Sequence, residues 1–181
     1  MRLPVIPADA MNDAQRAVYD AIVSGKRGRV PPPALAWLHS PGLAIHAQAM
    51  GEYIRYDSSL PAKWNEMAIL ITARHWTSHY EWYAHRRIAE AAGLDAAIIN
   101  AIRDRQAPVL PDAGAQAIYD YASALHRDRA VSQALHDAMV AAWGERGVVD
   151  LVGACGYYTF VSMTLNGFDV GLPDGAVSEL T

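Results

Sequence analysis

The densest group of ionisable and aromatic side chains lies between positions 66 and 85 of the 181-residue chain. Glu81 and His85 are four residues apart, so on a helix they face the same way and can share a hydrogen bond. A carboxylate beside an imidazole stabilises the imidazolium and fixes the orientation of the ring. Such a pair could act as a general acid or base near neutral pH. Glu66 begins the apolar run Met67–Ile71, and a carboxylate buried there needs a partner.

The same residues also allow a purely structural interpretation. Ser78 and Glu81 have the spacing of a capping box, in which both side chains bond to backbone groups at a helix start. The Glu81–His85 pair could equally be an ordinary exposed contact worth about 0.2–0.5 kcal/mol. Ser78 is therefore either a helix cap or a hydrogen-bond donor to a substrate. The histidines of this region have no recognisable metal-ligand spacing with Glu81, so no metal site is expected.

The elements that would position these residues are helices. Helical periodicity and capping residues recur along the chain, while strand-like alternation is almost absent. We expect an all-α, single-domain bundle of about seven to eight helices over residues 1–181, with its core in about 33–173. The expected helices, caps included, cover about 12–24, 40–56, 62–75, 78–93, 95–105, 112–126, 132–143 and 148–166, with Gly144 ending the seventh.

Composition excludes several classes of protein. The net charge of −4 argues against nucleic acid or an anionic membrane surface as partner, and we interpret the short basic run Lys26–Arg29 as a solvated loop. Cys155 is the single cysteine, so neither an intramolecular disulfide nor a thiolate metal cluster can form. The N-terminal residues have no signal-peptide pattern, and the apolar stretch Val148–Leu165 is shorter than the roughly 20 residues that span a membrane. We therefore expect a cytoplasmic protein.

The order Glu66, Ser78, Glu81, His85 resembles a known family pattern. The alkylhydroperoxidase-D-like branch of the carboxymuconolactone decarboxylase superfamily carries Glu-x(11)-Cys-x-x-Cys-x(3)-His. Glu66 and His85 stand at its outer positions, whereas Ser78 and Glu81 replace its two cysteines. Further similarity to a cysteine-free subgroup lies in 73–76, 80–85 and 147–166, so that the resemblance covers most of 33–173.

The resemblance implies a reaction without thiols. Peroxide reduction needs an attacking thiolate and a resolving thiol, and neither Ser78 nor Glu81 can supply one. True carboxymuconolactone decarboxylases resemble this chain in carrying Glu-x-x-x-His here, and they remove carbon dioxide from a carboxylated lactone without a cofactor. We therefore expect a cofactor-independent carboxy-lyase for a small carboxylated lactone or ketoacid. Its catalytic residues would be Glu66, Glu81 and His85.

Four further residues, Arg74, Ser78, Tyr157 and Tyr158, are expected to bind the substrate carboxylates or ring. Arg74 lies about one turn before Ser78, and its planar fork suits pairs of oxygens. Tyr157 and Tyr158 lie on the last helix, where core packing is the alternative role. The resemblance also implies a homo-oligomer, a trimer or a hexamer, in which the apolar last helix is covered. The competing hypotheses are a member of unknown or lost activity and a hydroperoxide reductase dependent on Cys155.

Overall fold

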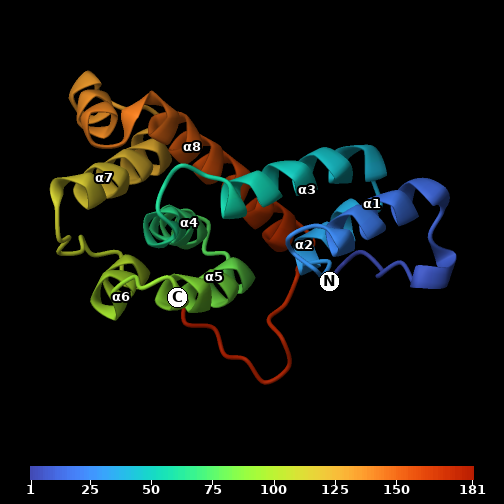
Figure 1. Cartoon of the computed structure of the whole chain (residues 1–181). Coiled ribbons are helices and arrows are strands. Elements are labelled where there is room, and N and C mark those ends of the chain that lie inside the picture. The colour runs from blue at the N-terminus through green and yellow to red at the C-terminus, as the bar shows by residue number, and fades with distance from the viewer.

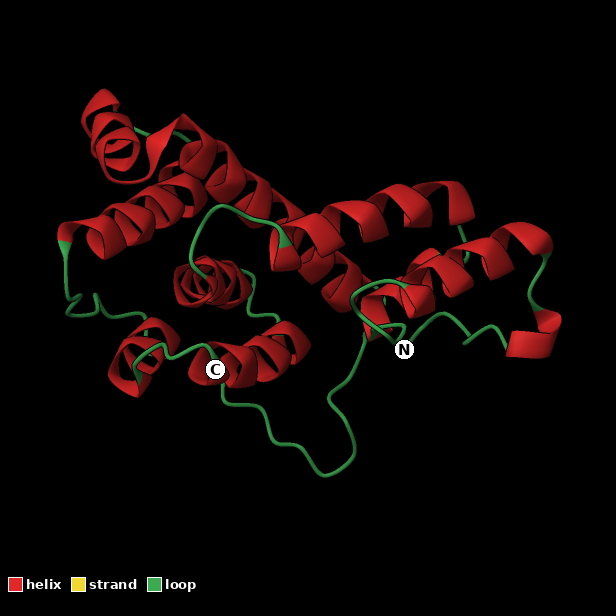
Figure 2. Ribbon diagram, viewed as in Figure 1, coloured by secondary structure: helices red, strands yellow, loops and turns green.

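The computed structural model describes all 181 residues and contains helices and connecting loops, without strands (Figures 1 and 2). This confirms the predicted all-α fold and its approximate number of helices. After a short 3-10 helix, Ala8–Ala10, the chain forms α1 Asp13–Ser24, α2 Pro32–Trp37, α3 Pro41–Tyr56, α4 Ala62–His75, α5 His79–Ala91, α6 Ala96–Arg103, α7 Ala113–Asp128 and α8 Gln133–Gly167.

Most helices begin at the residues that the sequence marks as caps. The side chains of Asn12, Asp95, Asp112 and Ser132 each accept a hydrogen bond from a backbone N–H in the first turn of their helix. The helix that the sequence did not predict is α2, which starts at Pro32 within the run Pro31–Pro33. Proline is well suited to the first turn of a helix, where its missing N–H has no partner to lose.

The expected stop at Gly144 is a kink inside α8 (Figure 1). Gly144 has φ 70° and ψ 172°, a conformation that is open to glycine and strained for other residues. The kink lets Trp143 lie against α7, where its Nε1 donates to the carbonyl of Gly114 over 2.8 Å. The predicted helices 132–143 and 148–166 are therefore two arms of one bent element.

Helix α4 lies at the centre of the molecule (Figure 1), and every residue from Trp64 to Arg74 is buried. One apolar core lies between α4 and the helices α5, α6, α7 and the middle of α8. The fully buried residues of this core include Met67, Ile99, Ile118 and Leu151. A second core joins α1, α2 and α3 to the end of α8, and Ile69 of α4 belongs to it. Because α4 is enclosed, each polar residue on it needs a partner inside the protein.

Helix α8 has the length and composition of a membrane span, but it is a core helix here. Of its most apolar window, 61% is buried inside the protein. The same helix carries Asp150, whose carboxylate accepts hydrogen bonds from the backbone N–H and hydroxyl of Ser59 and from Tyr53. These features are those of a helix packed inside a folded domain.

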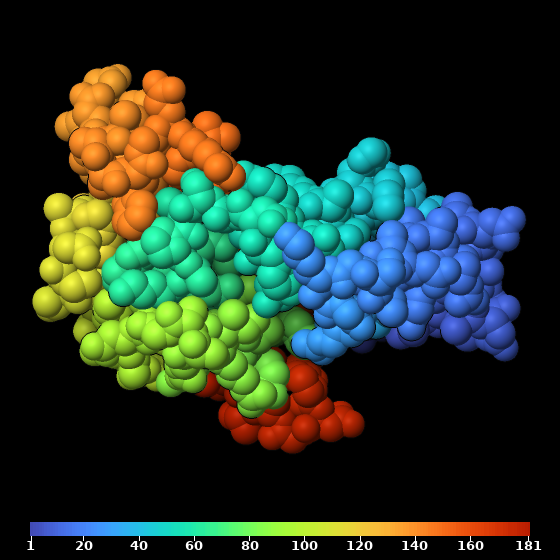
Figure 3. All heavy atoms as spheres, viewed as in Figure 1, coloured from blue at the N-terminus to red at the C-terminus, as the bar shows by residue number.

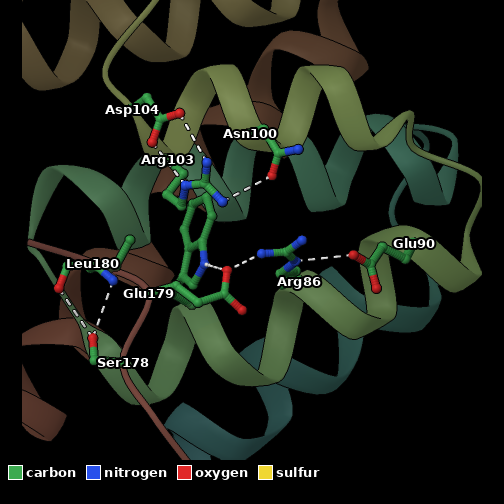
Figure 4. A network of polar contacts seen from close by, with 9 residues as sticks. Arg86, Glu90, Asn100, Arg103, Asp104, Ser178, Glu179 and Leu180 are labelled. Carbon is green, nitrogen blue, oxygen red and sulfur yellow. Dashed lines mark hydrogen bonds and ion pairs between the residues drawn. The ribbon is translucent and has the colours of Figure 1, made fainter.

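The segment 168–181 returns from the end of α8 to α5 without forming a helix, as the red segment of Figures 1 and 3 shows. Leu180 is buried in the core around α4. Glu179 forms an ion pair with Arg86 and accepts a hydrogen bond from the Trp82 indole, and Arg86 also pairs with Glu90 (Figure 4). The return segment is thus anchored on the helix that carries Glu81 and His85.

Candidate active site

Glu66, Glu81 and His85 meet in the interior of the protein. Glu66 comes from α4, and the other two lie one turn apart on α5. His85 Nδ1 is 2.6 Å from Glu66 Oε2, and His85 Nε2 is 3.0 Å from Glu81 Oε1. The three side chains are at most 6% exposed. The ring is therefore held between two carboxylates, one at each nitrogen, and we call this group the Glu-His-Glu triad.

The electrostatics of the triad keep its imidazole charged. Burial alone lowers the pKa of His85, but the charges and hydrogen bonds of Glu66 and Glu81 outweigh it and raise that pKa to about 9. At neutral pH the ring is an imidazolium that donates one N–H to each carboxylate. The triad then holds a proton beside two acceptors in a water-poor environment.

The capping box predicted for α5 does not form. Ser78 stands at the N-cap position but makes no side-chain capping hydrogen bond, and Glu81 contacts His85 instead. The Ser78 hydroxyl is fully buried and has no hydrogen-bond partner. Ser78 also does not line the pocket described next. The structure therefore supports neither of the two roles expected for Ser78: its side chain does not cap the helix, and it does not reach this pocket.

A pocket of about 420 Å³ opens beside the triad. Glu81 and His85 line it, whereas Glu66 lies behind the ring and does not. Tyr157 and Tyr158 also line it, and both belong to the second core as well, so they combine the two positions expected for them. The edge of Tyr158 meets His85 with ring centroids 4.8 Å apart, and the Tyr157 and Tyr158 rings are 5.2 Å apart. These aromatic contacts fix the orientation of the wall next to the imidazolium.

Both tyrosine hydroxyls stay protonated. Burial raises the pKa of Tyr157 to about 12, and burial together with the neighbouring glutamates raises that of Tyr158 well above its usual value. At physiological pH they act as neutral hydrogen-bonding groups and not as bases.

Arg74 does not reach this pocket. Its Nε donates to the carbonyl oxygen of Arg103 over 2.6 Å, and one of its terminal nitrogens donates to that of Thr181 over 3.1 Å. It lines a separate hollow beside His75 and His126. The structure thus separates Arg74 from the other predicted site residues and gives it backbone partners at the end of α6 and in the return segment.

The cationic side chains of the pocket are four other arginines. Arg27 and Arg29 come from the α1–α2 loop, Arg55 from the end of α3 and Arg87 from α5. None of them forms an ion pair with a carboxylate of the protein. Two of them come from the basic run Lys26–Arg29, for which the sequence indicates only a solvated loop. Unpaired guanidinium groups converging on one pocket favour an anionic ligand.

Cys155 has the environment of a core residue. It is buried in the core around α4, and burial raises the pKa of its thiol to about 12. It does not line the pocket beside the triad. Its thiolate is therefore not available for chemistry there.

Comparison with known proteins identifies the fold. No family model matches the sequence, and no curated protein matches it closely enough to be a relative. The apo structure of the debrominase Bmp8 superposes with a TM-score of 0.75 at 15% identity, covering 96% of this chain and 92% of that one. A cysteine-to-alanine variant of the debrominase Bmp8 in complex with 2,3,4-tribromopyrrole gives a TM-score of 0.74 at 16% identity, covering 96% and 94%. The protein therefore has an alkylhydroperoxidase-D-like fold, as the sequence resemblance predicted.

Proposed function

We propose that the protein is a cofactor-independent carboxy-lyase acting on a small carboxylated lactone or ketoacid. The observation that supports this most directly is the Glu-His-Glu triad, which meets a pocket lined by four arginines without carboxylate partners. A decarboxylase without a cofactor needs an anion-binding site and a proton donor beside it. This pocket has side chains suited to both tasks.

The proposed reaction breaks the bond between the substrate carboxyl group and its neighbouring carbon. Carbon dioxide leaves, and the bonding electrons move into the adjacent carbonyl system as an enolate. Arginine side chains hold the substrate carboxylate and offset the negative charge that develops on the enolate oxygen. Protonation of the carbon then gives the product, so that one proton is consumed for each carbon dioxide released.

The triad supplies that proton. His85 Nε2–H faces Glu81 Oε1, so a proton can pass between them over their 3.0 Å hydrogen bond. Both residues line the pocket and can deliver the proton to a bound substrate. Glu66 does not line the pocket; it holds Nδ1–H and so fixes the ring and its charge. We therefore assign Glu81 and His85 as the catalytic acid–base pair and Glu66 as a positioning residue.

Thiol chemistry is not supported at this site. A hydroperoxide reductase dependent on Cys155 would need that thiol in the pocket, and it lies elsewhere with a raised pKa. The debrominase Bmp8 shares the fold, and its variant binds 2,3,4-tribromopyrrole. This likeness favours a small ring-shaped substrate for the present protein, but the arginine-rich wall favours a carboxylated one.

The first experiment is turnover of 4-carboxymuconolactone and a panel of ketoacids, followed by absorbance and by release of carbon dioxide. We expect His85→Ala to lower kcat/KM by about 10²- to 10⁴-fold, the usual contribution of a general acid. His79→Ala is the matched control, because His79 lies exposed on the same helix and outside this pocket. If His85→Ala turns over substrate at the wild-type rate, the proposed role of His85 is wrong. If the wild type releases carbon dioxide from none of these substrates, the proposed carboxy-lyase activity is wrong.

A further inference from the structure

The α1–α2 loop that carries Arg27 is fitted closely onto α3. Lys26 Nζ bonds to both carboxylate oxygens of Asp57, at 2.5 and 2.7 Å. At Gly25, a Cβ atom would lie 2.5 Å from Glu52 Oε2, so only glycine permits this approach without displacement. Helices α1 and α3 lie side by side (Figure 1). The two residues that precede Arg27 are thus both held against α3 and its C-terminal end.

The Arg27 side chain itself packs against a second glycine, Gly51. Gly51 is buried in the middle of α3, where glycine is unfavourable compared with alanine. A Cβ atom there would lie 2.5 Å from an Arg27 guanidinium nitrogen and 2.5 Å from Tyr157 Cζ, and would overlap the Tyr157 hydroxyl. The absence of a side chain at position 51 therefore creates a notch, and the Arg27 and Tyr157 side chains occupy it.

The notch is connected to the triad through aromatic contacts. The Arg27 guanidinium and the Tyr157 hydroxyl lie beside each other in this notch. Tyr157 packs edge-on against Tyr158, which packs edge-on against His85. A continuous set of contacts thus fixes the place of the guanidinium relative to the imidazolium.

Arg27 differs in this respect from the other three arginines of the pocket. Arg29 and Arg87 are exposed, and the guanidinium of Arg87 lies over the ring of Tyr83. The guanidinium of Arg55 lies over the neighbouring Tyr56. Arg27 alone is held by a notch at a buried position of α3, and a cation placed in advance loses least freedom when it binds an anion.

We propose that Arg27, held in the Gly51 notch, binds the substrate carboxylate and sets its position relative to Glu81 and His85. The ligand class is a small planar ring that bears a carboxylate. The inference rests on the proposed function in taking this pocket as the substrate site. Gly51 acts through Arg27 and Tyr157 and is a positioning residue.

The test measures binding of benzoate and isophthalate to the full chain by titration calorimetry, with benzamide as the uncharged analogue. We expect Arg27→Ala to weaken carboxylate binding roughly ten- to a hundredfold, the usual effect of one charge-assisted hydrogen bond. Benzamide binding should be unaffected. Arg27→Lys, which keeps the charge and loses the fork, should restore part of the affinity.

Gly51→Ala should weaken carboxylate binding at least as much as Arg27→Ala, because a Cβ at position 51 would displace both the Arg27 guanidinium and the Tyr157 hydroxyl. Gly42→Ala is the matched control, because Gly42 lies on the same helix with open space where its Cβ would be. Circular dichroism and the melting temperature show that each variant is folded at the temperature of the titration.

Two results would overturn the inference: carboxylate binding that is unchanged in Arg27→Ala, or no binding of either carboxylate by the wild type. If Gly51→Ala does not fold, Arg27→Ala and Arg27→Lys still decide the role of Arg27. If only the proposed carboxy-lyase activity is wrong, the result is different: carboxylates bind in an Arg27-dependent way, but no carbon dioxide is released.

Discussion

Replacing Glu66 by glutamine removes one of the two carboxylates that keep the His85 ring charged. Glutamine preserves the shape of the side chain, so the change in charge is the main perturbation. Burial of His85 then acts against one remaining carboxylate, Glu81, and we expect the pKa of His85 to fall. The consequence should appear in the stability of the protein between pH 6.5 and 9.

The size of the effect follows from the pKa of His85, which is about 9 in the folded protein against 6.5 ordinarily. Because the folded pKa is the higher one, this stabilisation is fully present below pH 6.5 and is lost as the pH rises through 9. At about 1.4 kcal/mol per pKa unit, the wild-type free energy of unfolding should decrease by about 3 kcal/mol across this window. In Glu66→Gln most of that decrease should disappear.

The assay is urea unfolding at pH 6 and pH 9.5, combined with NMR titration of the His85 ring. Glu90→Gln is the control, because Glu90 lies on α5 with His85, is exposed, and pairs with Arg86 and not with the His85 ring. The control should keep the wild-type pH dependence. A wild-type His85 that titrates near 6.5, or equal pH dependence in wild type and Glu66→Gln, would refute the reasoning.

Two further predictions concern the fold and the assembly. Gly144→Ala should lower the free energy of unfolding by about 1–3 kcal/mol, because the backbone conformation of Gly144 is strained for alanine. A urea titration that finds no loss of stability would contradict this backbone conformation at the kink. We also propose the homo-oligomer that the sequence resemblance implies, through the exposed apolar side chains of α3 and α8. Val152→Glu on α8 should then reduce the mass measured by light scattering, whereas Val109→Glu in a loop should not, and a monomeric wild type would exclude the assembly.

Local sequence chemistry predicted the helices well, because caps act within a few residues. Asn12, Asp95, Asp112 and Ser132 could be recognised as helix starts since each bonds to its own first turn. Helix α2 was not predicted from its prolines, because proline both interrupts a helix and begins one. The choice between the two depends on the packing of α2 against the second core.

The candidate site was predictable only in part. The four-residue spacing brings Glu81 and His85 together by helix geometry alone, but the contact of Glu66 with His85 depends on how α4 packs against α5. Arg74 lies near Ser78 in sequence, yet its guanidinium turns to carbonyl groups at other chain segments. The arginines that do line the pocket come from three separate elements, and no local pattern brings them together.

The two apolar cores share α4 and α8, and the pocket is lined from both sides of their boundary. Arg27 and Pro33 belong to the α1–α2 side, while Glu81 and Arg87 belong to α5. The α1–α3 layer could therefore open as a unit while the core around α4 remains closed, in the way that native proteins unfold locally. A ligand bridging the pocket would tie the two units together, and amide hydrogens of α1–α3 would then exchange with solvent only when the whole molecule unfolds.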